Sequence, residues 1–144
     1  MGADFIDSNV FVYLFDDTDP QRRKTARAIV EKGIATGSSV VSFQVVQEVL
    51  NVTTHKMPRP LTAADAIAFF DTILAPMWRL YPSAELYRRA LEIKVRYHLS
   101  FYDSLIVGAA LEADCSRLLT EDLQDGQSIG SLKVVNPFVE EKRA

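Results

Sequence analysis

A chain of 144 residues is long enough for one domain that buries its own hydrophobic core without disulfides or a structural metal. Hydrophobic residues make up 48% of the chain and charged residues 24%, as is typical of a globular protein. The net charge of −3 argues against a protein that binds nucleic acid through bulk positive charge, although it leaves room for a local basic rim.

The cysteine content, the length of the apolar segments and the charge of the N-terminal segment indicate the cellular compartment. Cys115 is the only cysteine, so no internal disulfide can form, and we expect it to be a small buried residue at a helix end. No apolar stretch approaches the ~20 residues that a membrane span requires. The N-terminal segment carries Asp4 and Asp7 in place of a basic leader. We therefore expect a cytoplasmic protein without a membrane segment.

The first third of the chain predicts a strand followed by two helices. The strand is expected to end at Asp7, and a short helix over 10–15 follows the capping residues Ser8 and Asn9. Asp19 and Pro20 predict the start of the next helix and Gly33 predicts its end. The outer face of this helix is either simply solvated or a patch that contacts phosphate, and it carries Arg22, Arg23, Lys24 and Arg27.

The middle of the chain predicts a short strand, a helical hairpin and a second strand. A buried strand over 40–41 is followed by a helix over 43–55, in which Glu48 falls at the edge of the apolar face. We expect Glu48 to be half-buried and to face a cation, either a basic side chain or a metal. The next helix, over 62–74, would form a hairpin or clamp with it, whose aromatic residues either pack in the core or form a partner surface.

The following segments predict an amphipathic helix and then a fully buried one. After a short strand over 78–81, a helix over 83–97 is expected to turn one set of residues inward, namely Ala84, Tyr87, Ala90, Leu91 and Val95. Ser100 and Asp103 have the spacing of a capping box before a helix that is apolar nearly all round. A structural capping role is thus an alternative to a catalytic role for Asp103.

The C-terminal part predicts two more strands. Residues 117–119 form a short buried strand, with Thr120, Glu121 and Asp122 at its C-terminal end. A polar loop over 123–131 leads to a last strand over 132–135, which Asn136 and Pro137 end. We expect the tail over 139–144 to be flexible.

This alternation of short strands and helices predicts one α/β domain over 1–144, a three-layer sandwich with a central, mainly parallel sheet flanked by helices. In such a sheet Asp7 and Asp122 follow strand ends, and Asp103 and Glu48 lie on helices near the same edge. Crowded carboxylates raise one another's pKa unless a cation neutralises them, and such hard oxygen ligands select Mg²⁺ or Mn²⁺ over Zn²⁺. The chemistry that fits these acids is phosphodiester hydrolysis.

Four segments, in order and at the usual intervals, resemble the signature segments of the PIN domain, most closely those of VapC-type toxins: IDSNVFVYLF, SFQVVQEVLNV, FYDSLIVGAAL and LLTEDLQDG. The resemblance implies that four acids bind a divalent metal and position the attacking water: Asp7, Glu48, Asp103 and Asp122. It assigns supporting positions to Asn9 and Thr120. The place of the last acid varies in the family, and here Glu121, Asp122 and Asp125 compete; we choose Asp122, with Asp125 as an outer contributor.

The resemblance also implies an activity and partners. It implies a Mg²⁺- or Mn²⁺-dependent endoribonuclease that cuts structured RNA such as transfer or ribosomal RNA. It further implies a cognate antitoxin protein that inserts into the cleft, and a homodimer. A PIN-like module that binds RNA or protein without cutting is the alternative, although such modules usually lose acids and this chain keeps all four.

Other classes of protein fit the sequence less well. A receiver domain needs an acid pair after its first strand, and a haloacid-dehalogenase-type phosphatase needs a second aspartate where this chain has Asn9. Nucleophilic catalysis by Cys115 lacks a nearby histidine, and His55 and His98 are too far apart in sequence for a recognisable ligand spacing.

Overall fold

Six short strands form the centre of the computed structural model, which describes residues 2–139. Their order in the sheet is β3-β2-β1-β4-β6-β5, and all neighbouring strands are parallel except the antiparallel pair β5 and β6. The strands are β1 (Asp4–Ile6), β2 (Ser39–Ser42), β3 (Trp78–Leu80), β4 (Arg117–Leu119), β5 (Ser128–Ile129) and β6 (Leu132–Val135). The prediction of a mainly parallel sheet is confirmed, whereas the two-residue edge strand β5 lies where a loop was predicted.

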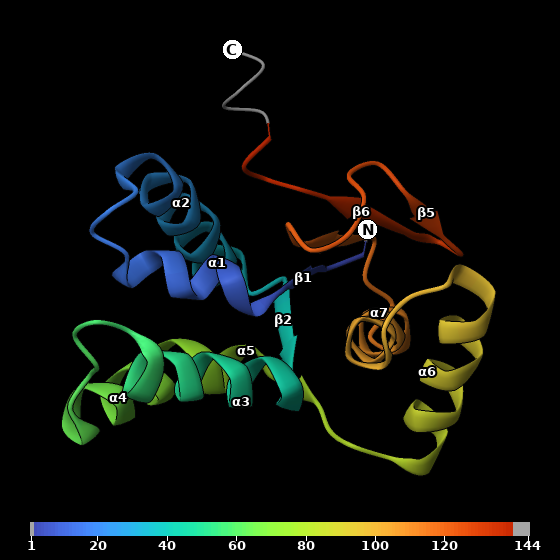
Figure 1. Ribbon diagram of the computed structural model, residues 1–144, viewed down its shortest axis with the longest axis horizontal. Coiled ribbons are helices and arrows are strands. Elements are labelled where there is room, and N and C mark those ends of the chain that lie inside the picture. The colour runs from blue at the N-terminus through green and yellow to red at the C-terminus, as the bar shows by residue number, and fades with distance from the viewer. Residues whose placement is uncertain (1, 140–144) are drawn as a thin grey trace.

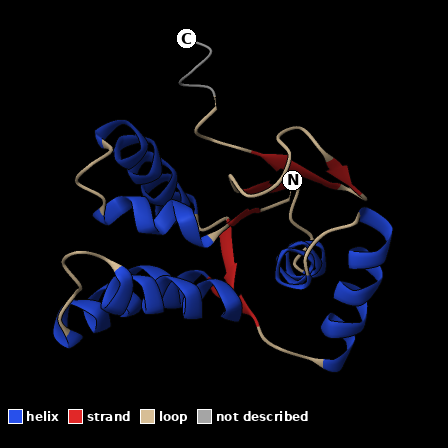
Figure 2. Cartoon of the chain, in the orientation of Figure 1, coloured by secondary structure: helices blue, strands red, loops and turns tan. Residues whose placement is uncertain are grey.

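The helices form two layers around the sheet. They are α1 (Ser8–Val12), α2 (Pro20–Thr36), α3 (Phe43–Asn51), α4 (Ala63–Phe69), α5 (Ala75–Met77), α6 (Ala84–Tyr97) and α7 (Phe101–Glu112). A 3₁₀ turn, η1 (Tyr13–Phe15), extends α1, and π-helical turns extend α3 and α4 as η2 (Val52–Lys56) and η3 (Phe70–Leu74). Helices α1 to α5 lie on one side of the strands and α6 and α7 on the other (Figure 1), with the strands as the middle layer (Figure 2). The three-layer sandwich is therefore confirmed.

One continuous core joins the three layers. Phe5 and Ile6 of β1 and Leu118 of β4 are fully buried between the helices. Helix α7 is buried over its whole central part, residues 104–110, as its all-round apolar sequence predicts. Among the described residues, no helix is long and apolar enough to cross a membrane. Most of the predicted flexible tail, residues 140–144, lies outside the described residues.

Helix α2 does not end where the sequence predicted. It continues through Gly33 to Thr36, and Gly37 caps it with a left-handed φ of 65° and an N–H that bonds to the carbonyl of Gly33. Gly33 is instead buried inside the helix, where an added Cβ would lie 2.7 Å from Ser39 Oγ and 2.9 Å from Ser39 Cβ. The glycine at this position allows α2 to approach β2 closely.

Replacing Gly33 with Ala is therefore expected to destabilise the protein by about 1–3 kcal/mol, the usual scale of overpacking. Helix propensity alone predicts the opposite, a gain of about 1 kcal/mol. Urea unfolding of the wild type and of Gly33→Ala decides between them. The cost should shrink when Ser39 is also replaced by Gly, and an unchanged cost in that background would contradict the contact as its cause.

Helix α6 turns a different face toward the core than the sequence predicted. Its buried residues are Leu86, Ala90 and Ile93, and of the predicted inward set only Ala90 is buried. Tyr87, Leu91 and Val95 instead lie on the outer side and are 38%, 52% and 76% exposed. Two apolar stripes run along this helix, so periodicity alone did not identify the stripe that packs on α7.

Candidate active site

Asp7 lies directly after β1, at the point where the chain enters α1. It is the N-cap of α1, and its Oδ1 accepts a hydrogen bond of 2.7 Å from the backbone N of Ser8. Its own N–H donates to the carbonyl of Leu119 on the neighbouring strand β4. With only 5% of its surface exposed, Asp7 is a carboxylate held rigidly at the C-terminal edge of the sheet.

Thr120 connects Asp7 to Asp122. This fully buried residue follows β4, and its Oγ1 donates a 2.7 Å hydrogen bond to Asp7 Oδ2. The same Oγ1 accepts a 3.1 Å hydrogen bond from the backbone N of Asp122. Asn9 approaches from α1, with its Nδ2 3.5 Å from Asp122 Oδ1. One hydroxyl group thus fixes the relative positions of two acid-bearing segments.

Asp103 and Glu48 come from two helices. Ser100 caps α7 by accepting a 3.1 Å hydrogen bond from the backbone N of Asp103, which is one half of the predicted capping box. Within residues 2–139 no hydrogen bond or ion pair occupies the Asp103 carboxylate. Glu48 lies half-buried on α3, and Gln44, one turn before it, donates a 3.2 Å hydrogen bond to the carbonyl of Tyr102. Gln44 therefore ties α3 to the first turn of α7.

The pKa shifts indicate that these acids lie close enough to interact electrostatically. Burial raises the pKa of Asp7 to about 7, and the charges of Asp122 and Glu48 add to the effect against the hydrogen bonds from Thr120 and Ser8. Burial also raises the pKa of Asp122, to which the charges of Asp103 and Glu121 contribute.

Glu48 shows the same behaviour from the opposite side of the site. Its pKa is raised by burial and by the charges of Asp122 and Asp103, while hydrogen bonds from the Ser8 and Gln44 side chains lower it. Among residues 2–139 no basic side chain forms an ion pair with Glu48. The four predicted acids thus form one electrostatically coupled group of negative charge.

This group has the chemistry of a divalent-cation site. All four side chains offer carboxylate oxygens, the ligands that Mg²⁺ and Mn²⁺ prefer. Asn9 adds a buried Oδ1 that has no hydrogen-bond partner among the described residues. As the side chains lie, no three His, Cys, Asp or Glu residues within 2–139 form a ready cage for a metal. The fit therefore rests on the oxygen donors and on their uncompensated charge.

Comparison with known proteins identifies the family. The model of the PIN domain family matches residues 5–124. This chain belongs to the PIN domain family. No curated protein sequence gave a significant match.

Solved structures with the same fold include chains of toxin–antitoxin systems. A toxin–antitoxin complex from Klebsiella pneumoniae aligns with a TM-score of 0.66 and 19% identity, covering 94% of this PIN domain and 98% of that chain. VapC20 of Mycobacterium tuberculosis, a toxin that cleaves the sarcin–ricin loop, aligns with a TM-score of 0.59 and 19% identity over 83% and 92% of the two chains. VapBC2 of Rickettsia felis, bound to a DNA fragment of its promoter, aligns with a TM-score of 0.66 and 17% identity, covering 92% of this chain and 96% of that chain.

The other acids near β4 have partners elsewhere in this PIN domain. Glu121 accepts a 2.6 Å hydrogen bond from the hydroxyl of Tyr13 and lies 3.7 Å from Arg22 Nε. Burial and this hydrogen bond raise the pKa of Tyr13 to about 12, so the hydroxyl stays protonated and donates. Asp125 accepts a 2.9 Å hydrogen bond from the backbone N of Asn136 and so fastens the loop to the end of β6.

The basic residues at the start of α2 are not a uniformly solvated face. Arg22 is paired with Asp19 at 2.8 Å and lies 5.7 Å above the ring of Tyr13, and Arg23 is paired with Asp17 at 3.2 Å. Both arginines are only partly exposed, whereas Lys24 and Arg27 are exposed. The first two residues of the predicted phosphate patch therefore also hold the α1–α2 loop.

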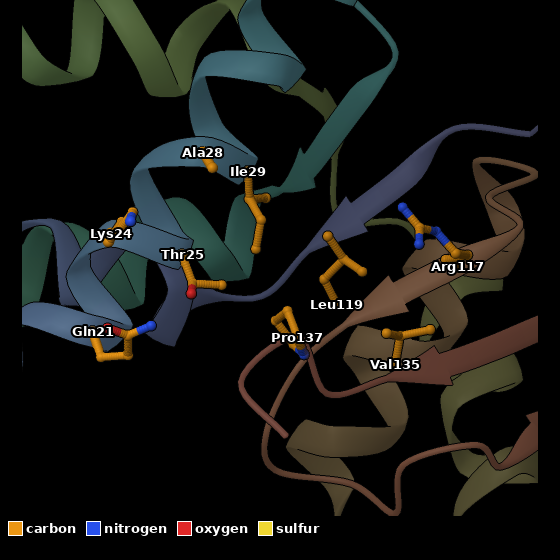
Figure 3. Close-up of a pocket in the computed structure, with 9 residues that line it drawn as sticks. All are labelled: Gln21, Lys24, Thr25, Ala28, Ile29, Arg117, Leu119, Val135 and Pro137. Atoms are coloured by element: carbon orange, nitrogen blue, oxygen red, sulfur yellow. The ribbon is translucent and has the colours of Figure 1, made fainter. Parts of the chain in front are cut away.

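A pocket next to this helix contains none of the four acids. Figure 3 shows this pocket, of about 410 Å³, between α2 on one side and β4, β6 and Pro137 on the other. Ile29 and Leu119 point into the gap from the two sides, and Lys24 and Arg117 lie on its lining. This pocket is therefore separate from the candidate site of this PIN domain.

Two residues of the site were not predicted from the sequence. The side chains of Ser8 and Gln44 act on Glu48 by lowering its pKa, and Gln44 is 5% exposed. The spacing of Gln44, four residues before Glu48 on the same helix, was the available signal. Cys115 is buried as predicted, and burial raises the pKa of its thiol to about 12, which leaves it unsuited to nucleophilic catalysis.

The raised pKa of Asp7 predicts a pH-dependent stability without metal. Between the ordinary value of 3.8 and about 7 the folded protein binds more protons than the unfolded chain, so the free energy of unfolding falls as the pH rises through this range. The free energy of unfolding falls by at most about 4 kcal/mol over this range, because one pKa unit corresponds to about 1.36 kcal/mol. In EDTA, Asp7→Asn is expected to be more stable than the wild type at pH 8, with a smaller difference at pH 5. Urea unfolding at both pH values measures this, and a pH-independent difference would contradict it.

Proposed function

We propose that this PIN domain is a Mg²⁺- or Mn²⁺-dependent endoribonuclease that hydrolyses phosphodiester bonds in RNA. The main support for this proposal is the group of interacting acids at the C-terminal edge of the sheet. In addition to burial, the charges of Asp122 and Glu48 raise the pKa of Asp7, and the charge of Asp122 raises the pKa of Glu48. Burying charges of one sign together costs free energy, and a bound cation offsets that cost.

Each side chain has a distinct part in the proposed site. Asp7, Asp103, Asp122 and Glu48 would hold the ion, which when bound would activate water and neutralise charge on the phosphate. Thr120 fixes the Asp7 carboxylate through its hydroxyl, and Asn9 orients Asp122. Asp122 fits the role of the last acid better than Asp125, because the Asp125 carboxylate is bonded to the backbone at the end of β6.

The solved structures with the same fold support a proposal about the partners of this chain. We infer that the chain is the toxin of a toxin–antitoxin pair, silenced by a cognate antitoxin protein, and that it acts on structured RNA such as ribosomal or transfer RNA. The structural similarity to chains of toxin–antitoxin complexes and to a toxin that cleaves the sarcin–ricin loop supports this inference. A homodimer in a reducing cytoplasm remains part of the same proposal.

The proposal is tested by incubating the purified protein with total cellular RNA in Mg²⁺ or Mn²⁺ and in EDTA. Discrete fragments that form only with the metal are expected, and sequencing of their ends identifies the substrate. A folded protein that binds RNA but leaves it intact with either metal would contradict the proposal and support the non-catalytic binding module.

A further inference from the structure

Three aromatic rings, the exposed Tyr87 and Tyr102 and the partly buried Phe101 between them, form a continuous cluster that includes the residue before Asp103. Tyr102, which directly precedes Asp103, is 66% exposed, and its ring centroid lies 5.4 Å from that of Phe101. Phe101 in turn stacks on Tyr87 of α6, with centroids 6.5 Å apart and an angle of 19° between the planes. The sequence predicted that Tyr87 points into the core, but the structure places it in this surface cluster.

The first turn of α7, which carries Phe101, Tyr102 and Asp103, is tied to α3 and capped by Ser100. Gln44 donates its 3.2 Å hydrogen bond to the carbonyl of Tyr102, and Ser100 caps the same turn of α7 through the backbone N of Asp103. Helices α6 and α7 lie side by side (Figure 1), and their contact is close because an added Cβ at Gly108 would lie 3.3 Å from Leu86 Cδ1. The backbone that carries Tyr102 and Asp103 is therefore held in place relative to α3 and α6.

The helix that carries Tyr87 is basic although the chain is acidic. Helix α6 has two acids, Glu85 and Glu92, against four exposed basic residues, Arg88, Arg89, Lys94 and Arg96. Within residues 2–139 none of these four forms an ion pair. Proteins that bind single-stranded nucleic acid combine basic side chains, which attract the backbone, with exposed rings on which bases stack, and α6 and the start of α7 carry both kinds of residue.

We propose that Tyr102, backed by Phe101 and Tyr87, stacks an unpaired RNA base next to the phosphate that is cut, while the basic residues of α6 contact the flanking backbone. The inference rests on the proposed nuclease function and adds to it the side chain that would distinguish unpaired from paired RNA at the cleavage site. Bases in a duplex are stacked on one another and shield their faces from such a ring.

A protein partner on this surface is the competing occupant. Leu91 and Val95 continue the exposed stripe along α6, and aliphatic side chains are typical of a protein interface. The aromatic end of the stripe, however, includes Tyr102, which directly precedes the candidate acid Asp103 on α7, and α6 carries more basic than acidic residues. These two features favour RNA over a second copy of the chain at Tyr102.

The test measures RNA affinity in EDTA, where the proposed reaction cannot proceed. The probes are a fluorescein-labelled oligo(A) of eight nucleotides, the same strand with one abasic position at its centre, and a duplex of eight base pairs. Tyr102→Ala is expected to bind the single strand about 5- to 100-fold more weakly, the scale of one stacked base. Tyr102→Phe keeps the ring and should bind within about twofold of the wild type. Affinity for the duplex should not change.

Two controls make the result specific. Tyr81→Ala removes another tyrosine of similar exposure, 59%, whose ring contacts Trp78 instead of α7, and it should bind the single strand like the wild type. The abasic strand should bind Tyr102→Ala and the wild type more equally than the intact strand does. Thermal unfolding checks the fold of each variant, and Tyr102→Leu replaces Tyr102→Ala if that variant unfolds.

The outcomes separate this inference from the nuclease function. Metal-dependent cleavage by the wild type together with equal RNA affinity of wild type and Tyr102→Ala overturns the stacking role alone. Loss of affinity in Tyr102→Ala without any cleavage by the wild type overturns the nuclease function, not the RNA contact. An equal loss of RNA affinity in Tyr81→Ala overturns the inference, because the effect would then not be specific to Tyr102. A loss of RNA affinity in Tyr102→Ala that accompanies dissociation of an oligomer in light scattering also overturns it, in favour of a protein-contact surface.

Discussion

Asp7→Asn is expected to lower the rate of RNA cleavage by about 10³-fold or more while the protein stays folded, the scale on which enzymes lose activity with one catalytic group. Asn has nearly the same shape as Asp, and its amide can accept from the backbone N of Ser8 and donate to Thr120 Oγ1, so both local contacts survive. The substitution therefore removes little except the negative charge. Single-turnover cleavage of the mapped RNA with saturating Mn²⁺ measures the effect.

A matched control is available on the surface. Asp71 is an exposed acid in η3, and Asp71→Asn should cleave at the wild-type rate. Because both variants change an aspartate to asparagine and the net charge by one, general electrostatic effects on RNA affinity are equal to a first approximation. An Asp7→Asn variant with wild-type circular dichroism and a rate near that of Asp71→Asn would remove Asp7 from the catalytic site.

Thr120→Val is expected to lower metal affinity or the cleavage rate by about 10- to 100-fold, the usual effect of losing a group that orients a ligand. Val has the shape of Thr, but it lacks the hydroxyl that donates to Asp7 Oδ2 and accepts from the backbone N of Asp122. Asp7 Oδ2 is then left buried without its donor, so the pKa of Asp7 should rise further and the pH dependence of cleavage should move to higher pH.

Thr120→Ser is the control for this prediction, because it keeps the hydroxyl and loses only a methyl group. It should retain most of the activity and the wild-type pH profile. If Thr120→Ser loses as much as Thr120→Val, packing of the methyl group at the end of β4 matters more than the hydrogen bonds, and the proposed link between Asp7 and Asp122 is wrong.

The acids were predictable from the sequence because they follow local signals. Asp7 and Thr120 come directly after short apolar runs, and parallel strands bring such positions to one edge of the sheet. Asp103 follows a helix cap, and Glu48 lies at the edge of an apolar helix face, which the structure confirms as half-buried. Each of these signals lies within a few residues of the side chain concerned.

What the sequence could not predict depends on contacts between distant segments. Periodicity placed Tyr87, Leu91 and Val95 inward, because a helix with two apolar stripes gives no local signal for which stripe meets α7. Gly33 looked like a helix end, yet it is a site of close approach to Ser39. The ion pair of Arg22 with Glu121 joins α2 to the segment after β4, a contact between residues far apart in the chain that no single stretch of sequence reveals.

Four acids from separate elements are proposed to act together as one divalent-cation site. Titration of the protein with Mn²⁺, followed by the loss of the free-ion signal in electron paramagnetic resonance, tests it most directly. We predict that the wild type and Asp71→Asn bind Mn²⁺ with the same affinity and that Asp7→Asn and Asp103→Asn each bind at least about tenfold more weakly. Equal Mn²⁺ affinity of all four proteins would show that Asp7 and Asp103 do not belong to a cation site.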